Sequence, residues 1–158
     1  MSAIPLPEPS LQRVDYFKAS PAAATAMMAL EAAVRKNGLE TSLLHLVRLR
    51  ASQINGCAYC LDLHTREARA DGESERRLYL LQVWREALIY TERERAALAW
   101  TESLTLVASK HVPDDVFQHA SQFFTEAELV NLTLAVVAIN AWNRFSIGFN
   151  SIPKATVD

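Results

Sequence analysis

The chain has 158 residues, of which half are hydrophobic but only 8% are aromatic, and it carries a formal net charge of −2 at pH 7. A chain of this length predicts one domain with a core of its own, and its interspersed charges give no electrostatic basis for nucleic-acid binding. The N-terminus has no basic region followed by an apolar run, as a signal peptide would, and no apolar run approaches the roughly 20 residues that span a membrane. We therefore expect a cytoplasmic protein that binds neither nucleic acid nor membrane.

The two ends of the chain are expected to lie outside the folded domain. Residues 1–12 hold three of the six prolines, Pro5, Pro7 and Pro9, and predict an extended N-terminal arm. We place one helical domain at residues 13–150 and a short C-terminal tail at residues 151–158. No repeat at a fixed period, low-complexity tract or linker divides the domain.

Helix caps divide the domain into about seven predicted helices. Ser20-Pro21 combines a capping hydroxyl with proline at the first helical position, and Thr91 and Thr125 each open a capping box. All four glycines fall at predicted helix ends, and no alternating strand pattern is present. The sequence therefore predicts an all-α single-domain bundle, with helices over about residues 21–36, 41–53, 57–70, 74–84, 91–110, 113–124 and 125–145.

The only two cysteines, Cys57 and Cys60, lie at the start of the third predicted helix, and His64 follows one turn later. Residues at i, i+3 and i+7 share one helix face, so the three side chains form one stripe. A helix N-terminus stabilises a thiolate, and a histidine four residues beyond Cys60 is placed to accept its proton. The stripe predicts a redox dithiol that passes through a sulfenic acid and closes to a disulfide.

Two other interpretations of this stripe stay open. Cys57, Cys60 and His64, with His45 from the preceding helix, would supply four ligands for zinc, although structural zinc sites usually join separate loops. Alternatively, both cysteines are small buried hydrophobic residues and His64 is a satisfied core side chain. Haem attachment is discarded because Leu61 follows the second cysteine where a histidine is required, and a thioredoxin fold because no strands surround the motif.

Three further features bear on packing. The stretch Asn140–Arg144 places amides beside Trp142 in an apolar helix, and it predicts helix packing or a subunit contact with satisfied amides. Met27 and Met28 are expected to fill the core. Because the aliphatic content is high for a lone domain of this size, we also expect a subunit interface.

The segment at residues 50–64, RASQINGCAYCLDLH, resembles the signature of the alkylhydroperoxidase AhpD-like group of the carboxymuconolactone decarboxylase superfamily. The run AINAWNR at residues 138–144 is similar to the closing motif of that group. The resemblance covers about residues 13–149. It implies an AhpD-like helical fold, a homo-oligomer that is a trimer or a hexamer, and thiol peroxidase or disulfide reductase activity.

The resemblance also implies roles for the stripe. Cys60 would attack a small-molecule hydroperoxide, Cys57 would resolve the product, and His64 would belong to the proton relay. The helix-dipole argument alone favours Cys57 as the more acidic thiol, and the family assignment is preferred because His64 is placed beside Cys60. The decarboxylase branch lacks this cysteine pair, so lactone decarboxylation is not expected.

At one position the chain departs from the family pattern. The characterised peroxidases carry a glutamate twelve residues before the first cysteine, as the outer member of the relay, and His45 stands there in this chain. A histidine can shuttle protons near neutral pH, so we assign His45 to the relay. It supplies no fixed negative charge to hold His64, and Glu94 and Glu102 from another helix are the candidates to do so.

The expected enzyme is therefore an antioxidant thiol peroxidase that needs no cofactor. Its electron donor would be a dithiol reductant or, as in studied relatives, a lipoyl-bearing adaptor. A dithiol oxidoreductase without peroxidase activity is the open alternative, beside the zinc-binding protein described above.

Overall fold

The structure, a computed structural model, describes residues 12–153, so residues 1–11 of the expected N-terminal arm and residues 154–158 of the C-terminal tail lie outside the described residues. Every regular element within residues 12–153 is helical, which confirms the all-α prediction. The elements are α1 (Tyr16–Ala19), α2 (Pro21–Arg35), α3 (Thr41–Asn55), α4 (Ala58–Ala70), α5 (Glu75–Leu80), the 3-10 helix η1 (Leu81–Val83), α6 (Glu92–Thr105), α7 (Val107–Lys110), α8 (Asp114–Phe123) and α9 (Glu126–Gly148).

This described part contains more helices than the seven predicted, because short elements lie beside the longer ones. Asp15 caps α1 by accepting a hydrogen bond from the Lys18 amide at 3.2 Å. The helix predicted over residues 91–110 is interrupted at Leu106, where a φ of −99° and a ψ of 18° separate α6 from α7. The helix predicted over residues 74–84 leaves α geometry after Leu80 and continues as η1.

The predicted caps explain where the longer helices begin. Ser20 caps α2 with proline at its first position, and Ser74 caps α5. Thr91 and Thr125 form capping boxes with glutamates three residues later, at the starts of α6 and α9. Each box satisfies two backbone amides that have no partner within the helix, so these starts are encoded locally.

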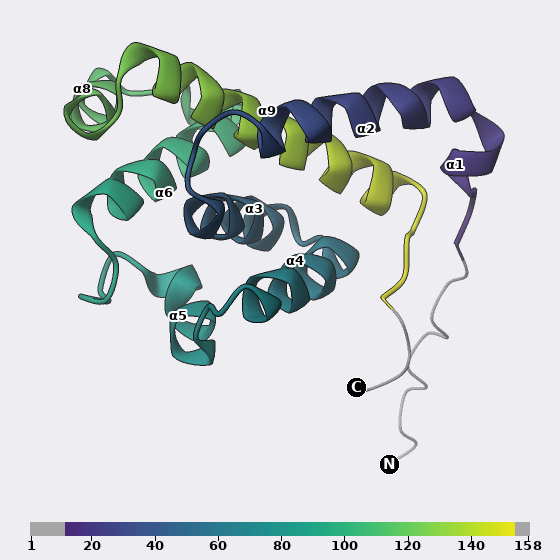
Figure 1. Cartoon of the computed structure of the whole chain (residues 1–158), viewed down its shortest axis with the longest axis horizontal. Coiled ribbons are helices and arrows are strands. Elements are labelled where there is room, and N and C mark those ends of the chain that lie inside the picture. The colour runs from purple at the N-terminus through teal and green to yellow at the C-terminus, as the bar shows by residue number, and fades with distance from the viewer. Residues whose placement is uncertain (1–11, 154–158) are drawn as a thin grey trace.

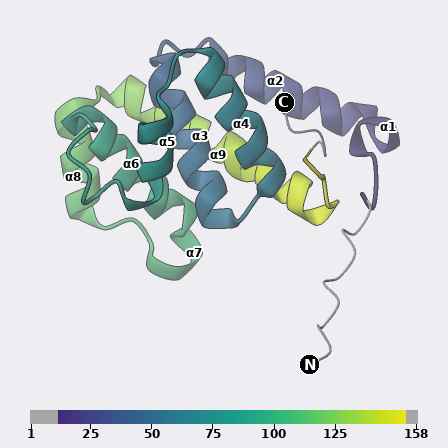
Figure 2. The ribbon, with the colours of Figure 1, turned by 90° about the horizontal axis from the view of Figure 1, so that it is seen from below.

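The helix α3 forms the centre of the bundle and packs against α4, α6 and α9 (Figure 1). In Figure 1, α4 and α5 lie below α3 and the long α9 lies above it, so that in the view from below α4 and α5 are in front and α9 is behind (Figure 2). One cluster of buried side chains, where α3 meets α6, α8 and α9, includes Leu43, Val47, Trp100, Leu132 and Val136. A second, where α3 meets α4, α5 and η1, includes Leu46, Leu49, Ala68, Leu81 and Trp84.

The last turns of α9 bring the C-terminal part of the domain to the beginning of the chain. Phe145 packs edge-on against Tyr16 of α1, with ring centroids 5.2 Å apart. The amide of Arg13 donates to the carbonyl oxygen of Phe149 at 2.9 Å. No single helix of the described chain is long and apolar enough to cross a membrane; α8 and α9 pass that test only as a pair, bent by 117°.

Candidate active site

A left-handed turn at Gly56 joins α3 to α4 and carries the first cysteine. Gly56 ends α3 with a φ of 67°, which glycine adopts without the steric cost that a side chain would bring. The Cys57 amide donates to the carbonyl oxygen of Ser52 at 3.0 Å and closes the turn. Cys57 is then the N-cap of α4, and its Sγ accepts a hydrogen bond from the Cys60 amide at 3.3 Å. The Cys57 sulfur therefore lies at the positive end of the helix.

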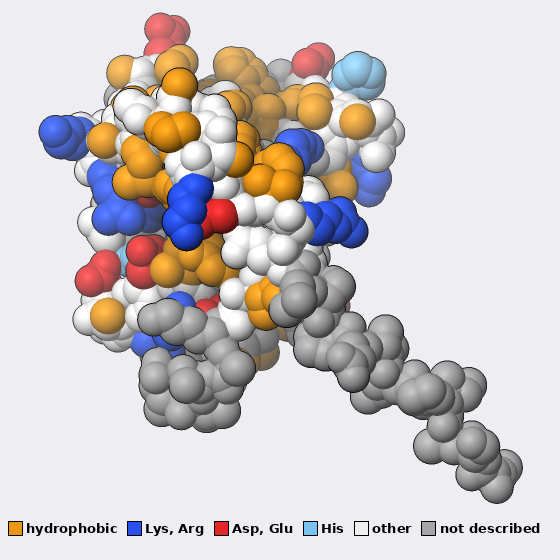
Figure 3. Space-filling view, turned by 90° about the vertical axis from the view of Figure 1, so that its right-hand side faces the viewer, with side chains coloured by type: hydrophobic (Ala, Val, Ile, Leu, Met, Phe, Trp, Pro, Cys, Tyr) orange, Lys and Arg blue, Asp and Glu red, His pale blue; other side chains and the backbone are white. Residues whose placement is uncertain are grey.

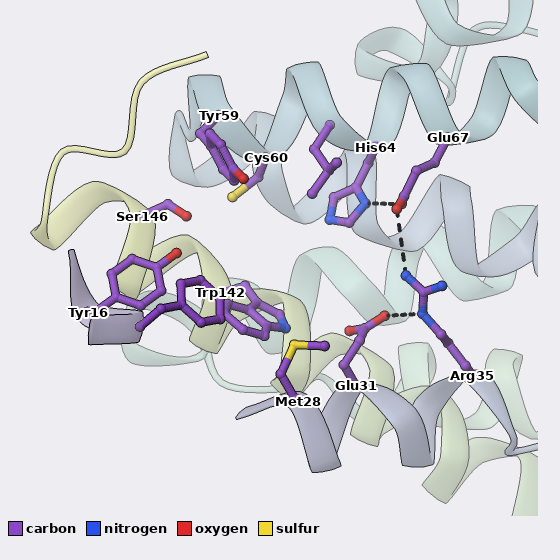
Figure 4. A pocket seen from close by; sticks show the side chains of 12 residues that line it. Tyr16, Met28, Glu31, Arg35, Tyr59, Cys60, His64, Glu67, Trp142 and Ser146 are labelled. Carbon is purple, nitrogen blue, oxygen red and sulfur yellow. Dashed lines mark hydrogen bonds and ion pairs between the residues drawn. The ribbon is translucent and has the colours of Figure 1, made fainter. Parts of the chain in front are cut away.

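The two cysteines are joined as a disulfide, with their Cα atoms 5.3 Å apart. Both are buried, Cys57 to 1% exposure and Cys60 to 3%. Of the two, Cys60 is the one that lines a pocket between α4 and the helices α1, α2 and α9 (Figure 4). A small molecule in this pocket would meet the sulfur of Cys60 before that of Cys57.

The pocket has a volume of about 220 Å³, and most of its wall is apolar or aromatic. These wall residues are Tyr16, Phe17, Met28, Tyr59, Leu63 and Trp142. Phe17 of α1 stacks on Trp142 of α9 with ring centroids 6.3 Å apart, so the packing of two helices distant in sequence builds one side of the pocket. The sequence pattern predicts none of these residues at the site, and Trp142 is noted there only within the packing stretch at residues 140–144.

The outer wall of the pocket is open to solvent. Phe17 is 48% exposed and Met28 is 52% exposed. The expectation that Met28 fills the core is therefore wrong, because α2 lies at the edge of the bundle and turns this side chain toward the pocket. Hydrophobic side chains gather on the end of the molecule where α1 lies, with charged side chains between them (Figure 3).

His64 lies one turn beyond Cys60 on the same face of α4, and both side chains point into the pocket (Figure 4). Its Nδ1 atom is 2.9 Å from Oε2 of Glu67. The hydrogen bond from His64 lowers the pKa of the Glu67 carboxyl below its usual value, because it outweighs the opposing effect of burial. Among the described residues, Nε2 of His64 has no hydrogen-bond partner, and it is the ring nitrogen left for the pocket.

Arg35 and a second glutamate, Glu31, close the far end of the pocket, and Arg48, which is not part of its lining, contacts Glu31. Glu31 accepts hydrogen bonds from Arg48 at 2.7 Å and from Arg35 at 3.2 Å. Arg35 also lies 3.6 Å from Glu67. The charges of the two arginines balance those of the two glutamates, so this end of the pocket is polar without a net charge.

His45 lies outside the pocket that Cys60 and His64 line. It is 3% exposed, and its Nε2 atom is 2.7 Å from Oδ2 of Asp71. Its Nδ1 atom is buried without a hydrogen-bond partner in the described part of the chain. His45 lines a separate cleft between α3 and α4, and Glu67 borders both that cleft and the pocket. The assignment of His45 to a proton relay stays a prediction.

The two glutamates expected to hold His64 have other partners. Glu94 accepts hydrogen bonds from Arg77. Glu102 accepts from the indole of Trp84 and from Arg50, both at 2.8 Å. That expectation is wrong, because both carboxylates are held by these partners and Glu67 occupies the position beside His64. The spacing of three residues between His64 and Glu67 is the signal that could have identified it.

The described residues contain no group of three or more His, Cys, Asp or Glu side chains arranged to hold a metal ion. His45, the fourth ligand of the alternative zinc interpretation, is directed at Asp71. The geometry therefore gives the zinc alternative no support.

An amide network fixes the turn that carries the cysteines. The side chain of Asn55 donates to Oδ1 of Asn143 at 2.8 Å and to Oδ1 of Asn140 at 3.0 Å. Asn143, which is fully buried, donates in turn to Oγ of Ser52 at 3.0 Å. The predicted packing role of residues 140–144 is confirmed within the chain, because these amides find partners on α3 and hold its last turn, directly before Gly56.

The chain is similar in sequence to known proteins. The model of the carboxymuconolactone decarboxylase family matches residues 21–103. The uncharacterised protein YdfG of Bacillus subtilis (strain 168) is 39% identical over 140 residues, which are 89% of this chain and 95% of that protein.

Solved structures are similar as well. The protein ATU0492 of Agrobacterium tumefaciens, described as a protein of unknown function and a candidate antioxidant defence protein AhpD, is 47% identical. It superimposes with a TM-score of 0.90 over 92% of this chain and all of that chain. The debrominase Bmp8 shares the fold at 20% identity, with a TM-score of 0.77 over 88% of this chain and 75% of that chain.

Proposed function

The chain belongs to the carboxymuconolactone decarboxylase family, in its AhpD-like group, and from this premise we propose that it is a thiol-dependent peroxidase that reduces organic hydroperoxides. The dithiol of Cys57 and Cys60 would carry the two electrons. One observation carries the proposal: Cys60 and His64 face the same apolar pocket, while Cys57 lies behind Cys60 and within bonding distance of it.

The first step forms one bond and breaks one. The Cys60 thiolate attacks the outer oxygen of the hydroperoxide, so that a sulfur–oxygen bond forms and the oxygen–oxygen bond breaks. The sulfur is oxidised to a sulfenic acid, and the peroxide is reduced to an alcohol. His64 accepts the Cys60 proton before the attack and returns it to the departing alkoxide, which is general base and then general acid catalysis by one group.

The second step closes the disulfide that the structure contains. The Cys57 thiol attacks the sulfenic sulfur of Cys60 and releases water. An external dithiol then restores both thiols by exchange and becomes a disulfide itself. The Cys57 sulfur is suited to this exchange because it accepts a hydrogen bond from the Cys60 amide at the N-terminus of α4. This hydrogen bond and the helix dipole stabilise a thiolate at Cys57.

The pocket favours an organic hydroperoxide over hydrogen peroxide. Its wall offers Phe17, Met28 and Trp142 to an apolar group. Its Cys60 end brings together the hydroxyl groups of Tyr16, Tyr59 and Ser146 (Figure 4), which can donate to the two peroxide oxygens. Burial of an apolar group contributes binding energy that hydrogen peroxide cannot supply.

The proposal is tested by the consumption of hydroperoxide with dithiothreitol as the reductant. Cumene hydroperoxide, tert-butyl hydroperoxide and hydrogen peroxide are compared, with Cys60→Ser as the control. We expect one alcohol for each organic hydroperoxide consumed, and slower turnover of hydrogen peroxide. Consumption by the wild-type protein no faster than by Cys60→Ser would contradict the proposal and leave a dithiol oxidoreductase of another substrate.

The same dithiol favours a second candidate, the reductive removal of bromine from an aromatic ring. The aromatic side chains of Phe17, Tyr59 and Trp142 around Cys60 suit a flat substrate, and Bmp8 has been solved with 2,3,4-tribromopyrrole. Two thiols would supply two electrons, a proton would replace the bromine, and bromide would leave. Release of bromide from tribromopyrrole, with dithiothreitol and above the level of Cys60→Ser, would favour this candidate over the peroxidase.

A further inference from the structure

Glu67 is the carboxylate that contacts His64, and neither the sequence pattern nor the family resemblance identifies it. It follows His64 by three residues on α4, and the two side chains meet at 2.9 Å between Nδ1 and Oε2. The His64 side chain is 9% exposed and that of Glu67 is 32% exposed, so the contact is shielded from most of the solvent. A hydrogen bond to an ionised carboxylate in such a position is stronger than one between neutral groups.

The groups that face Glu67 from neighbouring helices keep it ionised. Arg35 of α2 lies 3.6 Å from its Oε1 atom, and the positive charge of Arg48 of α3 acts on it as well. Glu31 of α2 opposes them, but its own carboxylate is bound to both arginines. Because an ionised carboxylate has no proton to donate, the hydrogen of this bond must sit on Nδ1 of His64.

The consequence is a fixed tautomer for His64. With a hydrogen held on Nδ1, the neutral ring carries its lone pair on Nε2, the nitrogen left for the pocket that Cys60 lines. Without Glu67, the ring could turn or take the other tautomer, in which Nε2 is a donor and cannot accept the thiol proton. A carboxylate that orients a histidine in this way is a recurring device in active sites.

We propose that Glu67 is the positioning residue of this site, which holds His64 with Nε2 directed at Cys60 and supports its positive charge after proton transfer. Glu67 would be the outer member of the proton relay, the role that the family pattern gives to a glutamate twelve residues before Cys57. His45 occupies that position in this chain. The carboxylate is thus supplied from the helix that carries the dithiol, one turn beyond the histidine. This inference rests on the proposed function, since it explains how His64 activates Cys60.

The first test needs no variant. Nitrogen-15 NMR of the reduced wild-type protein distinguishes the two tautomers of a neutral histidine by the shifts of its ring nitrogens. We expect His64 to carry its hydrogen on Nδ1, with Nε2 unprotonated. A neutral His64 with its hydrogen on Nε2 would overturn the proposal, because Glu67 would then have no donor to accept from.

The second test compares Glu67→Gln with Asp62→Asn, which removes a carboxylate from the same helix where it pairs only with the surface residue Arg66 at 2.9 Å. The readout is the rate of Cys60 alkylation by iodoacetamide across pH in a Cys57→Ser background, which requires no peroxide. We expect Glu67→Gln to lower the rate near neutral pH about 10- to 100-fold, the loss that follows when a histidine loses its orienting partner, and to move the midpoint of the profile to higher pH. Asp62→Asn should change neither the alkylation rate nor the midpoint of the profile.

Glu67→Asp serves as the conservative variant and should recover part of the rate, because it keeps the charge on a shorter side chain. A profile for Glu67→Gln that superimposes on that of the control would overturn the proposal. Since neither alkylation nor the tautomer depends on the substrate, these outcomes stand apart from a failure to consume hydroperoxide, which would overturn only the peroxidase assignment.

Discussion

The Nδ1 atom of His64 lies 2.9 Å from Oε2 of Glu67, one turn further along the helix that carries Cys60. One helix therefore supplies a thiol, its proposed base and the carboxylate that holds the base. Such an arrangement needs no contact between distant elements to align these three groups, because the helical spacing alone places them on one face. The neighbouring helices α1, α2 and α9 then contribute the wall of the pocket, and α2 contributes Arg35 beside Glu67.

Removal of the imidazole tests whether His64 acts chemically. His64→Ala should slow the reaction of Cys60 with cumene hydroperoxide by roughly 10²–10⁴-fold, the usual contribution of a general base. The measurement is a single-turnover rate from stopped-flow fluorescence of the reduced protein. His119→Ala, which removes a histidine from α8 outside the pocket, is the control and should react at the wild-type rate. An effect below about threefold would mean that His64 only packs in the pocket.

His45→Glu separates the two candidates for the carboxylate of the relay. If His45 is the outer member, this change restores the family pattern and should speed the reaction with hydroperoxide. If Glu67 holds that role, the new carboxylate lies next to Asp71 and in the same cleft as Glu67, where like charges repel. Our account predicts no gain in the single-turnover rate and a lower free energy of unfolding. A faster reaction in a folded variant would return the role to position 45.

Glu102 ties α3, η1 and α6 together, and its replacement should destabilise the fold. Burial alone would raise the pKa of its carboxyl, but the hydrogen bond from Trp84 and the charge of Arg50 outweigh it, and the pKa falls below the usual value of 4.5. Glu102→Gln should lower the free energy of unfolding near neutral pH by about 1.5–3 kcal/mol, the contribution of a hydrogen bond to a charged group. Urea denaturation measures this, with the exposed Glu86→Gln as control.

The pH dependence of that loss follows from the direction of the shift. Because the folded-state pKa of Glu102 lies below 4.5, its contribution is complete above pH 4.5 and declines as the pH falls through the lowered value. The difference between the wild-type protein and Glu102→Gln should therefore be constant from neutral pH down to about 4.5 and shrink below it. A difference that grew on acidification would contradict the assignment.

The exposed apolar wall around Phe17 and Met28 predicts self-association. Both residues are about half exposed at the open edge of the pocket. Together with the family resemblance, this leads us to expect a trimer or a hexamer in solution. Light scattering at micromolar concentration should give a mass that is three or six times the 17.6 kDa of one chain. A monomer would show that no second subunit covers this wall and that the prediction of a subunit interface is wrong.

Much of the fold was predictable because its determinants are local. The capping boxes at Thr91 and Thr125 and the left-handed turn at Gly56 depend on residues within four positions of each other, and the structure contains all of them. The same holds for Cys60 and His64, whose common face follows from helical spacing, whereas Cys57 is the N-cap of α4 and does not line the pocket. The interruption at Leu106 was not predictable in this way, because no proline or glycine marks it in the sequence.

The pocket was not predictable, because it is built by packing. Phe17 and Trp142 are 125 positions apart and meet only because the end of α9 lies against α1. The partner of His64 was missed for a different reason. Glu94 and Glu102 were sought on another helix, whereas their own arginines, Arg77 and Arg50, hold them elsewhere. Which of many possible ion pairs forms depends on tertiary packing, whereas the contact of His64 with Glu67 follows from their spacing of three residues on one helix.

The central claim is that Cys60 is the thiol that attacks a hydroperoxide and Cys57 the thiol that resolves it. The most direct measurement is mass spectrometry of the reduced Cys57→Ser variant after one equivalent of cumene hydroperoxide in the presence of dimedone, which traps sulfenic acids. The account predicts a dimedone adduct on Cys60 in this variant, and a peptide lighter by two hydrogens, recovered with dithiothreitol, in the wild-type protein. An unmodified Cys60 in Cys57→Ser, together with an adduct on Cys57 in Cys60→Ser, would contradict it.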